Sequence, residues 1–191
     1  MTSLRATAIA GAFVAGILTV AALGAQTPGQ GGGAKLTPEQ ILDYHTKDEK
    51  GGSAEAGRPA FEKQCAICHR FGPLGKDVGP DLTTIASRFK KKDVLESVLW
   101  PSKVISDQYQ AEMFELADGK MITGVIVRET AAAVLVRTAE SPDKPVAIAK
   151  GKIANRAPST VSLMPEGLLD GMTQEQVADL LAFMMAPPPA K

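Results

Sequence analysis

The pentapeptide Cys65-Ala66-Ile67-Cys68-His69 constrains this chain more than any other segment, because it contains both cysteines and one of the two histidines. A CxxCH run is typical of covalent attachment of a c-type haem. Each thiol would add to a vinyl group to form a thioether, and the adjacent histidine would bind the iron as its proximal axial ligand. The pattern therefore predicts one haem c, held by Cys65, Cys68 and His69.

Three other uses of the same residues are weaker. A zinc site needs four nitrogen or sulfur ligands, and beyond these three the chain offers only the distant His45. A thioredoxin-like CxxC pair lies near a βαβ pattern, which the flanking sequence lacks. A disulfide between Cys65 and Cys68 would close a very short loop and add little stability. Haem attachment is therefore the favoured interpretation.

The N-terminus has the features of an export signal. Arg5 precedes a largely apolar run over residues 6–23, and small residues around Ala25 suit cleavage. The run is close to the length that spans a bilayer, so an uncleaved membrane anchor is the alternative to a cleaved signal peptide. In either case, residues 1–25 are expected to direct the rest of the chain to the periplasm.

The charge of the chain argues against some partners. Its 21 basic and 21 acidic residues balance, so no strong field favours nucleic acid. Lys90, Lys91 and Lys92 form the only basic cluster. We interpret it as the solvated start of a helix, with docking of an acidic redox partner as the alternative. Without its leader, the chain has the size of one domain.

Residues 26–53 are predicted to form a flexible arm with a short helix. Residues 26–34 are rich in glycine and show no apolar periodicity, so they cannot form a packed element. Thr37-Pro38-Glu39-Gln40 resembles a capping box that opens a helix carrying His45. We expect His45 to be a surface histidine on this arm; a sixth iron ligand is the less favoured alternative.

The cysteines are predicted to lie on the first helix of the main domain. Proline is tolerated only in the first turn, so Pro59 places the start of this helix close to itself. Phe61, Cys65 and Cys68 follow at spacings of four and three, which would put them on one face.

Three more helices are expected. Two cover residues 83–89 and 92–100, and the last begins at Thr173 with a capping box. A proline-rich tail over residues 187–191 ends it. The apolar face of the last helix is predicted to consist of Val177, Leu180, Leu181 and Met184.

The segment from about residue 109 to residue 153 has a β pattern instead. Asp118-Gly119 separates two β-prone stretches and favours a type I′ hairpin turn. The pattern predicts an antiparallel meander of four strands. Their expected ranges are residues 109–116, 120–128, 134–138 and 146–149.

Five motifs together resemble those of class I cytochromes c. They are Gly57-x-x-x-Phe61, Cys65-x-x-Cys68-His69, Gly79-Pro80-Asp81-Leu82, Leu99-Trp100-Pro101 and Met164-Pro165. More narrowly, residues 54–186 are similar to the cytochrome c domain widespread in Planctomycetes and Verrucomicrobia, which has a strand-rich insertion ahead of its Met-Pro. The resemblance implies a mainly α cytochrome c fold, with helices packed round a covalently bound haem and an antiparallel β meander inserted at about residues 109–153.

The resemblance also implies the distal ligand. It points to Met164, with Met172 as the main rival, and a thioether ligand raises the reduction potential relative to a second imidazole. The other candidates are interpreted as packing residues. They are Met113 and Met121 in the strands, and Met184 and Met185 in the last helix.

Neighbouring residues follow from the same resemblance. The carbonyl of Pro80 would accept a hydrogen bond from His69 and so orient its ring. Arg88 and Trp100 could reach the haem propionates, although ordinary surface and core roles are equally open to them. Phe61 and Phe183 are expected to pack where the first and last helices cross.

The expected function is transfer of single electrons by an exported monohaem cytochrome that is not itself an enzyme. With His69 and Met164 on the iron, no coordination position is open to a substrate. Redox proteins, such as a dehydrogenase donor or an oxidase acceptor, would be its partners. Two alternatives stay open: a haem subunit docked to a periplasmic dehydrogenase through the meander, and a haem enzyme or gas sensor with a labile Met164.

Overall fold

The computed structural model describes residues 36–47 and 51–190. All of them belong to one compact unit, residues 35–191. The predicted signal peptide or anchor over residues 1–25 and the glycine-rich stretch over residues 26–34 lie outside the described residues. Within the described ranges, no helix is both long and apolar enough to cross a membrane.

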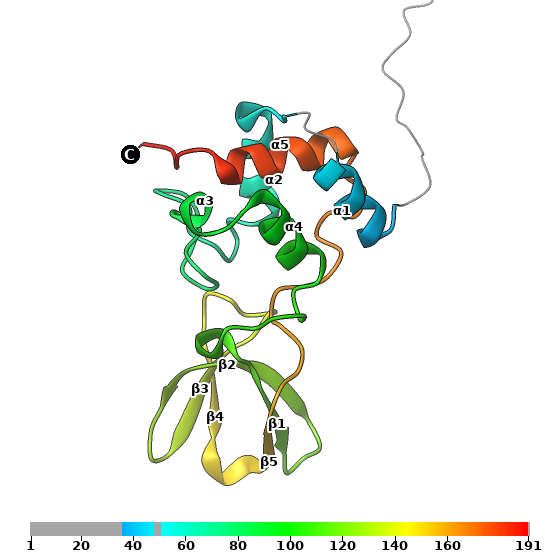
Figure 1. Ribbon diagram of the computed structural model, residues 1–191. Coiled ribbons are helices and arrows are strands. Elements are labelled where there is room, and N and C mark those ends of the chain that lie inside the picture. The colour runs from blue at the N-terminus through cyan, green and yellow to red at the C-terminus, as the bar shows by residue number, and fades with distance from the viewer. Residues whose placement is uncertain (1–35, 48–50, 191) are drawn as a thin grey trace, which may run out of the picture. The chain divides into compact units, whose positions relative to one another are not determined.

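One part of the unit is helical (Figure 1). Its helices are α1 (Pro38–Lys47), α2 (Ala54–Gln64), α3 (Ile85–Arg88), α4 (Lys91–Leu99) and α5 (Gln174–Met185). The rings of Phe61, Phe71 and Phe183 meet in its core, with centroids 5.3 to 5.5 Å apart. The expected packing of Phe61 on Phe183 is therefore confirmed, and it holds α2 against α5.

The two helices approach very closely at Gly57. A Cβ atom on Gly57 would lie 1.9 Å from the carbonyl oxygen of Asp179, so no larger residue fits without moving α5. Nearby, the Asp179 carboxylate accepts a hydrogen bond of 2.6 Å from the backbone N–H of Ser53. The start of α2 is thereby fixed to the middle of α5.

Helix α5 agrees with the sequence pattern. The Thr173 hydroxyl accepts a hydrogen bond from the N–H of Gln176, and the Gln176 side chain accepts one from the N–H of Thr173. This reciprocal pair is the predicted capping box. The residues predicted for the apolar face are all buried: Val177, Leu180, Leu181 and Met184.

Helix α1 forms as predicted but is not a surface element throughout. Thr37 and Gln40 exchange the hydrogen bonds of a capping box. Ile41 and His45 are buried, because α1 packs against α4 and α5. His45 is only 4% exposed, so the prediction of a surface histidine is wrong.

Helix α2 begins earlier and ends earlier than predicted. Ser53 caps it by accepting a hydrogen bond from the N–H of Ala56, so Pro59 lies inside the helix and not in its first turn. At the other end, the N–H groups of Cys65 and Ala66 both bond to the carbonyl of Phe61, which stops the α-helical ladder. The CxxCH motif therefore follows the helix in a turn instead of lying on it.

The other part of the unit is a five-stranded antiparallel sheet in the order β4-β3-β2-β1-β5. Its strands are β1 (Glu112–Leu116), β2 (Met121–Glu129), β3 (Ala133–Arg137), β4 (Val146–Ala149) and β5 (Ile153–Pro158). The first four match the predicted meander. The fifth was not predicted, and it pairs with β1.

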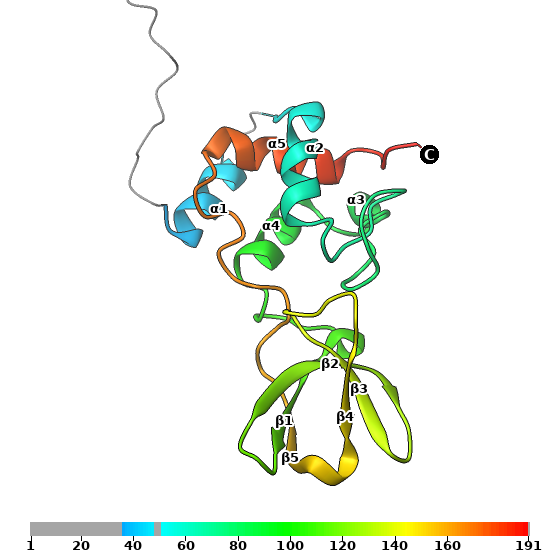
Figure 2. The same cartoon turned by 180° about the vertical axis from the view of Figure 1, so that it is seen from behind.

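The connection between β4 and β5 makes the sheet curl. These strands lie at opposite edges of the sheet, yet only the 3₁₀ turn Lys150–Lys152 separates them in the chain. The two edges must therefore come close together, and Figures 1 and 2 show the curled sheet. A second, separate hydrophobic core fills it, formed by Phe114, Val134, Val136 and Ile148.

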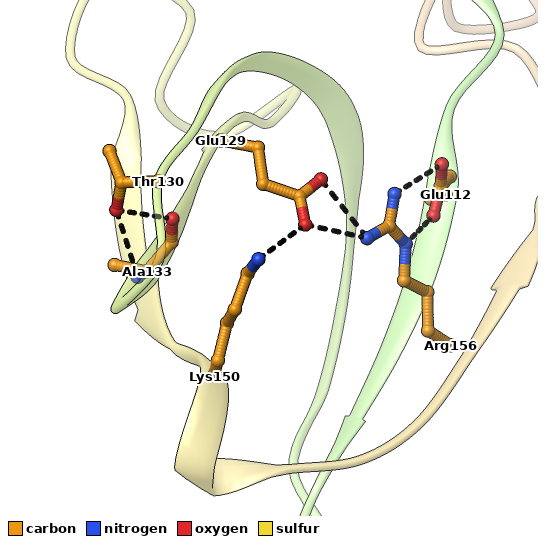
Figure 3. Close-up of polar contacts among 6 residues, drawn as sticks. All are labelled: Glu112, Glu129, Thr130, Ala133, Lys150 and Arg156. Carbon is orange, nitrogen blue, oxygen red and sulfur yellow. Dashed lines mark hydrogen bonds and ion pairs between the residues drawn. The ribbon is translucent and has the colours of Figure 1, made fainter.

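Charged side chains join the strands beside this core (Figure 3). Arg156 binds both carboxylate oxygens of Glu112 and lies 3.2 Å from Glu129. Lys150 binds the same Glu129 at 2.8 Å. The guanidinium of Arg156 also lies 5.6 Å from the ring centroid of Phe114. The network thus links β5, β1, β2 and the turn after β4.

The chain leaves the helical part and returns to it at one place. Ala111, just before β1, accepts a hydrogen bond of 2.8 Å from the N–H of Ser159, just after β5. Both residues are buried, at 0% and 2% exposed. The sheet is therefore an insertion between two helical segments, and a hydrogen bond holds the two ends of the insertion together.

The predicted fold class, a mainly α cytochrome c fold, is wrong. The described residues have an α+β fold, with 34% of them in helices and 20% in strands, and with a five-stranded antiparallel sheet. The strand content was underestimated because β5 was missed. The sheet was expected to be an inserted meander of four strands, whereas it is a curled five-stranded layer with a core of its own.

The hairpin between β1 and β2 also differs from the prediction. A type I′ turn needs a positive φ at both central residues, but only Gly119 has one, at 83°. The N–H of Gly119 bonds to the carbonyl of Leu116, and the N–H of Leu116 bonds to the carbonyl of Lys120. The turn is thus one residue longer, with Gly119 in the left-handed position of a bulge.

Candidate functional site

The CxxCH motif forms a compact turn at the end of α2. The N–H groups of Cys68 and His69 both donate to the carbonyl of Cys65, at 3.1 and 2.8 Å. This places the two cysteines and the histidine together. Both cysteines are free thiols and are partly buried.

The imidazole of His69 has a defined polarity. Its Nδ1 lies 2.7 Å from the carbonyl oxygen of Pro80, the contact expected from the sequence. A carbonyl can only accept, so Nδ1 carries the proton and Nε2 keeps its lone pair. Burial lowers the pKa of His69, partly opposed by this hydrogen bond. The ring is therefore held neutral, with Nε2 as the nitrogen that can bind a metal.

Two glycines make room for this histidine. A Cβ atom on Gly79 would lie 2.7 Å from Cε1 of His69 and 3.0 Å from its Nδ1. A Cβ atom on Gly75 would lie 2.0 Å from the carbonyl oxygen of His69, and Gly75 has a φ of 79°. The imidazole therefore packs directly on the backbone of residue 79, which no other residue type would allow unchanged.

The loop after the motif folds back onto it. The N–H groups of Val78 and Gly79 donate to the carbonyl of Cys68, at 3.0 and 2.8 Å. Arg70 binds Asp81 at 2.8 Å and Asp77 at 3.1 Å. Hydrogen bonds from Thr83, together with Arg70, lower the pKa of Asp81 to about 2. The carboxylate thus stays charged and keeps the end of the loop in place.

The cysteines do not resemble a redox-active pair. Burial and then the neighbouring Cys68 raise the pKa of Cys65 to about 12, and burial also raises the pKa of Cys68. The reactive thiol of a catalytic CxxC pair has a lowered pKa instead. Among the described residues, no group of three or more His, Cys, Asp or Glu side chains could hold a metal ion. The geometry leaves two neutral thiols beside a neutral imidazole.

Met164 lies in a loop that is tied to the end of α4. Its N–H donates to the Ser162 hydroxyl, and the N–H of Ser162 donates to the hydroxyl of Ser102, each at 3.1 Å. Trp100 and Glu166 line one cavity of about 390 Å³ in this region. The structure thus places the predicted ligand Met164 and the predicted propionate contact Trp100 in the same neighbourhood.

The remaining candidates are placed as follows. Met184 is 2% exposed in the helical core, so its packing role is confirmed, and Met172 packs against the same core. Met113 and Met121 are 37% and 56% exposed, so their predicted packing role in the strands is wrong. The outward face of the sheet carries them. Arg88 is exposed, and its guanidinium lies 5.3 Å from the ring centroid of Phe89.

Sequence reasoning missed the contribution of the sheet to this site. Asp143, in the turn between β3 and β4, binds Lys76 at 2.6 Å. Arg137, at the end of β3, donates through Nη1 to the carbonyl of Asp77 at 3.5 Å. These pairs are 67 and 60 residues apart in the chain, and nothing in a local pattern connects them.

Comparison with known proteins adds no family assignment. No protein-family model and no curated protein matches the chain. The resemblance to cytochromes c therefore stays a prediction from the motifs.

Proposed function

We propose that the protein is an exported c-type cytochrome that carries single electrons. Cys65 and Cys68 would hold one haem c through thioethers, and His69 and Met164 would bind its iron. One observation supports this most strongly. The His69 ring is fixed through Nδ1 on Pro80, so its Nε2 lone pair stays available beside two free thiols.

The residues around His69 suit a bound haem. Burial keeps His69 neutral, the form in which an imidazole binds a metal. The backbone of Gly79 supports the ring, and the Pro80 carbonyl holds its orientation, as is usual for metal-bound histidines. A bound haem iron would supply the redox chemistry, one electron taken up or released at a time. With Met164 also bound to the iron, the reduction potential would be higher than with a second imidazole, and no coordination position would be open to a substrate.

The proposed setting is the periplasm, reached through the leader. The partners would be redox proteins, such as a dehydrogenase donor or an oxidase acceptor, and not nucleic acid. The balanced charge of the chain argues against nucleic acid as a partner.

The first experiment is a pyridine haemochrome spectrum of the exported protein. We expect a c-type spectrum, with haem that stays on the chain under denaturing conditions. The variant with Cys65→Ser and Cys68→Ser should lose the covalent haem. Protein that is exported, folded and free of haem would refute the proposal.

A second experiment tests the distal ligand. Ferrous Met164→Ala should bind carbon monoxide rapidly, whereas the wild type and the control Met121→Ala, changed at an exposed methionine, should bind it slowly. Rapid binding by the wild type, unchanged in Met164→Ala, would contradict Met164 ligation and favour a gas sensor or enzyme. Rapid binding by Met172→Ala in place of Met164→Ala would make Met172 the ligand.

A further inference from the structure

The sheet makes direct contact with the loop that holds His69. The Asp143 carboxylate binds Lys76 at 2.6 Å, and the Arg137 guanidinium donates to the carbonyl of Asp77 at 3.5 Å. Figures 1 and 2 both show the turn between β3 and β4 reaching the loop between α2 and α3. Both sheet residues belong to the end of the sheet nearest the motif.

The other side of the same loop is bound to the motif. Val78 and Gly79 donate their N–H groups to the carbonyl of Cys68, and the Pro80 carbonyl accepts from His69. Residues 76 and 77 therefore contact the sheet, while the three residues that follow contact the motif. This short segment therefore connects the sheet end to the imidazole.

We propose that the sheet positions His69. Asp143 and Arg137 act as positioning residues: they restrain Lys76 and Asp77, and these fix the Gly79-Pro80 segment that orients the ring. As a statement about an iron ligand, this rests on the proposed function. Its consequence is that a partner bound to the sheet would alter the electronic environment of the axial imidazole without touching the haem.

The restraint can be measured by amide hydrogen exchange in the purified full-length protein. Asp143→Asn and Lys76→Gln should each speed exchange of the Val78 and Gly79 amides by about two- to fivefold, the range expected for breaking one exposed ion pair. The double variant Lys76→Asp with Asp143→Lys restores an ion pair of opposite polarity and should restore slow exchange.

The matched control is Lys150→Gln, which breaks the ion pair of Lys150 with Glu129 in the same sheet. It should leave the Val78 and Gly79 amides unchanged. Equal acceleration in the control would mean that the sheet only stabilises the whole fold, and no acceleration in Asp143→Asn or Lys76→Gln would mean that the contacts restrain nothing. Either result overturns the proposal.

A second readout concerns the histidine itself. In the haem-loaded protein, Asp143→Asn should raise the reduction potential, because a looser Nδ1–H hydrogen bond makes the imidazole a weaker donor to the iron. An unchanged potential, despite faster exchange, would overturn the link to His69. The exchange measurement does not need haem, so a haem-free protein would refute the proposed function while the restraint is still tested on its own.

Discussion

Substitution of Gly79 by alanine tests the packing of the histidine site. The new Cβ would lie 2.7 Å from Cε1 of His69, and an ordinary contact needs at least 3.4 Å, so the ring must move by about 0.7 Å (3.4 − 2.7). That movement would stretch the 2.7 Å contact with Pro80 nearly to breaking. Overpacking costs about 1–3 kcal/mol and the hydrogen bond about 1 kcal/mol. Alanine regains up to about 1 kcal/mol by restricting the unfolded chain, so a net loss of about 1–4 kcal/mol is expected.

The assay is urea unfolding followed by far-UV circular dichroism, with Gly151→Ala as the control. Gly151 has no atom near its added Cβ and no positive φ, so that variant should be as stable as the wild type or more stable by up to about 1 kcal/mol. The His69 Nδ1–H signal in the NMR spectrum, measured in the same samples, should shift only in Gly79→Ala. A Gly79→Ala protein as stable as Gly151→Ala, with this signal unchanged, would refute the described packing.

Three further predictions concern stability. Gly57→Ala should destabilise the protein by about 2 kcal/mol or more in urea unfolding, because α2 and α5 must separate to make room for the new Cβ. Helix propensity alone would increase the stability, and that result would contradict the close crossing of the two helices. Asp81→Asn should lower stability at pH 6 and much less at pH 2, because the pKa of Asp81 is lowered to about 2. The contribution of the carboxylate is present above its ordinary pKa of 3.8 and is lost as the pH falls through 2. A pH-independent difference between urea midpoints would rule this out. Arg156→Gln should cost about 1 kcal/mol at low salt and less at 1 M salt, and an effect that salt leaves unchanged would mean that Arg156 acts by packing.

The sequence predicted the elements that local patterns control. The capping box at Thr173 and the apolar face of α5 depend on neighbouring residues only, and so do the first four strands. Strand β5 has no such pattern: Ile153-Ala154-Asn155-Arg156-Ala157-Pro158 does not alternate, and it is a strand because the edge of β1 is available to it. His45 was misplaced for a similar reason, since its burial depends on α4 and α5.

In the candidate site, too, only contacts between nearby motifs could be predicted from the sequence. The contact of His69 with Pro80 was expected because both lie in recognisable motifs 11 residues apart. The contacts of Asp143 with Lys76 and of Arg137 with the carbonyl of Asp77 join residues that are 67 and 60 positions apart, and contacts of this kind leave no periodic signal. The end of α2 before Cys65 was also missed, because two amides compete for one carbonyl there in a way that helical spacing does not reveal.

The hydrogen bond between Ser159 and Ala111 shortens the loop that has to close between His69 and Met164. Met164 follows His69 by 95 residues (164 − 69), but 48 of these (159 − 111) lie between two residues that are hydrogen-bonded to each other. The effective separation is therefore 47 residues (95 − 48). Halving a loop lowers its closure entropy cost by about 0.6 kcal/mol. The sheet thus adds a folded surface to the protein without adding its 48 residues to the loop between the two proposed iron ligands.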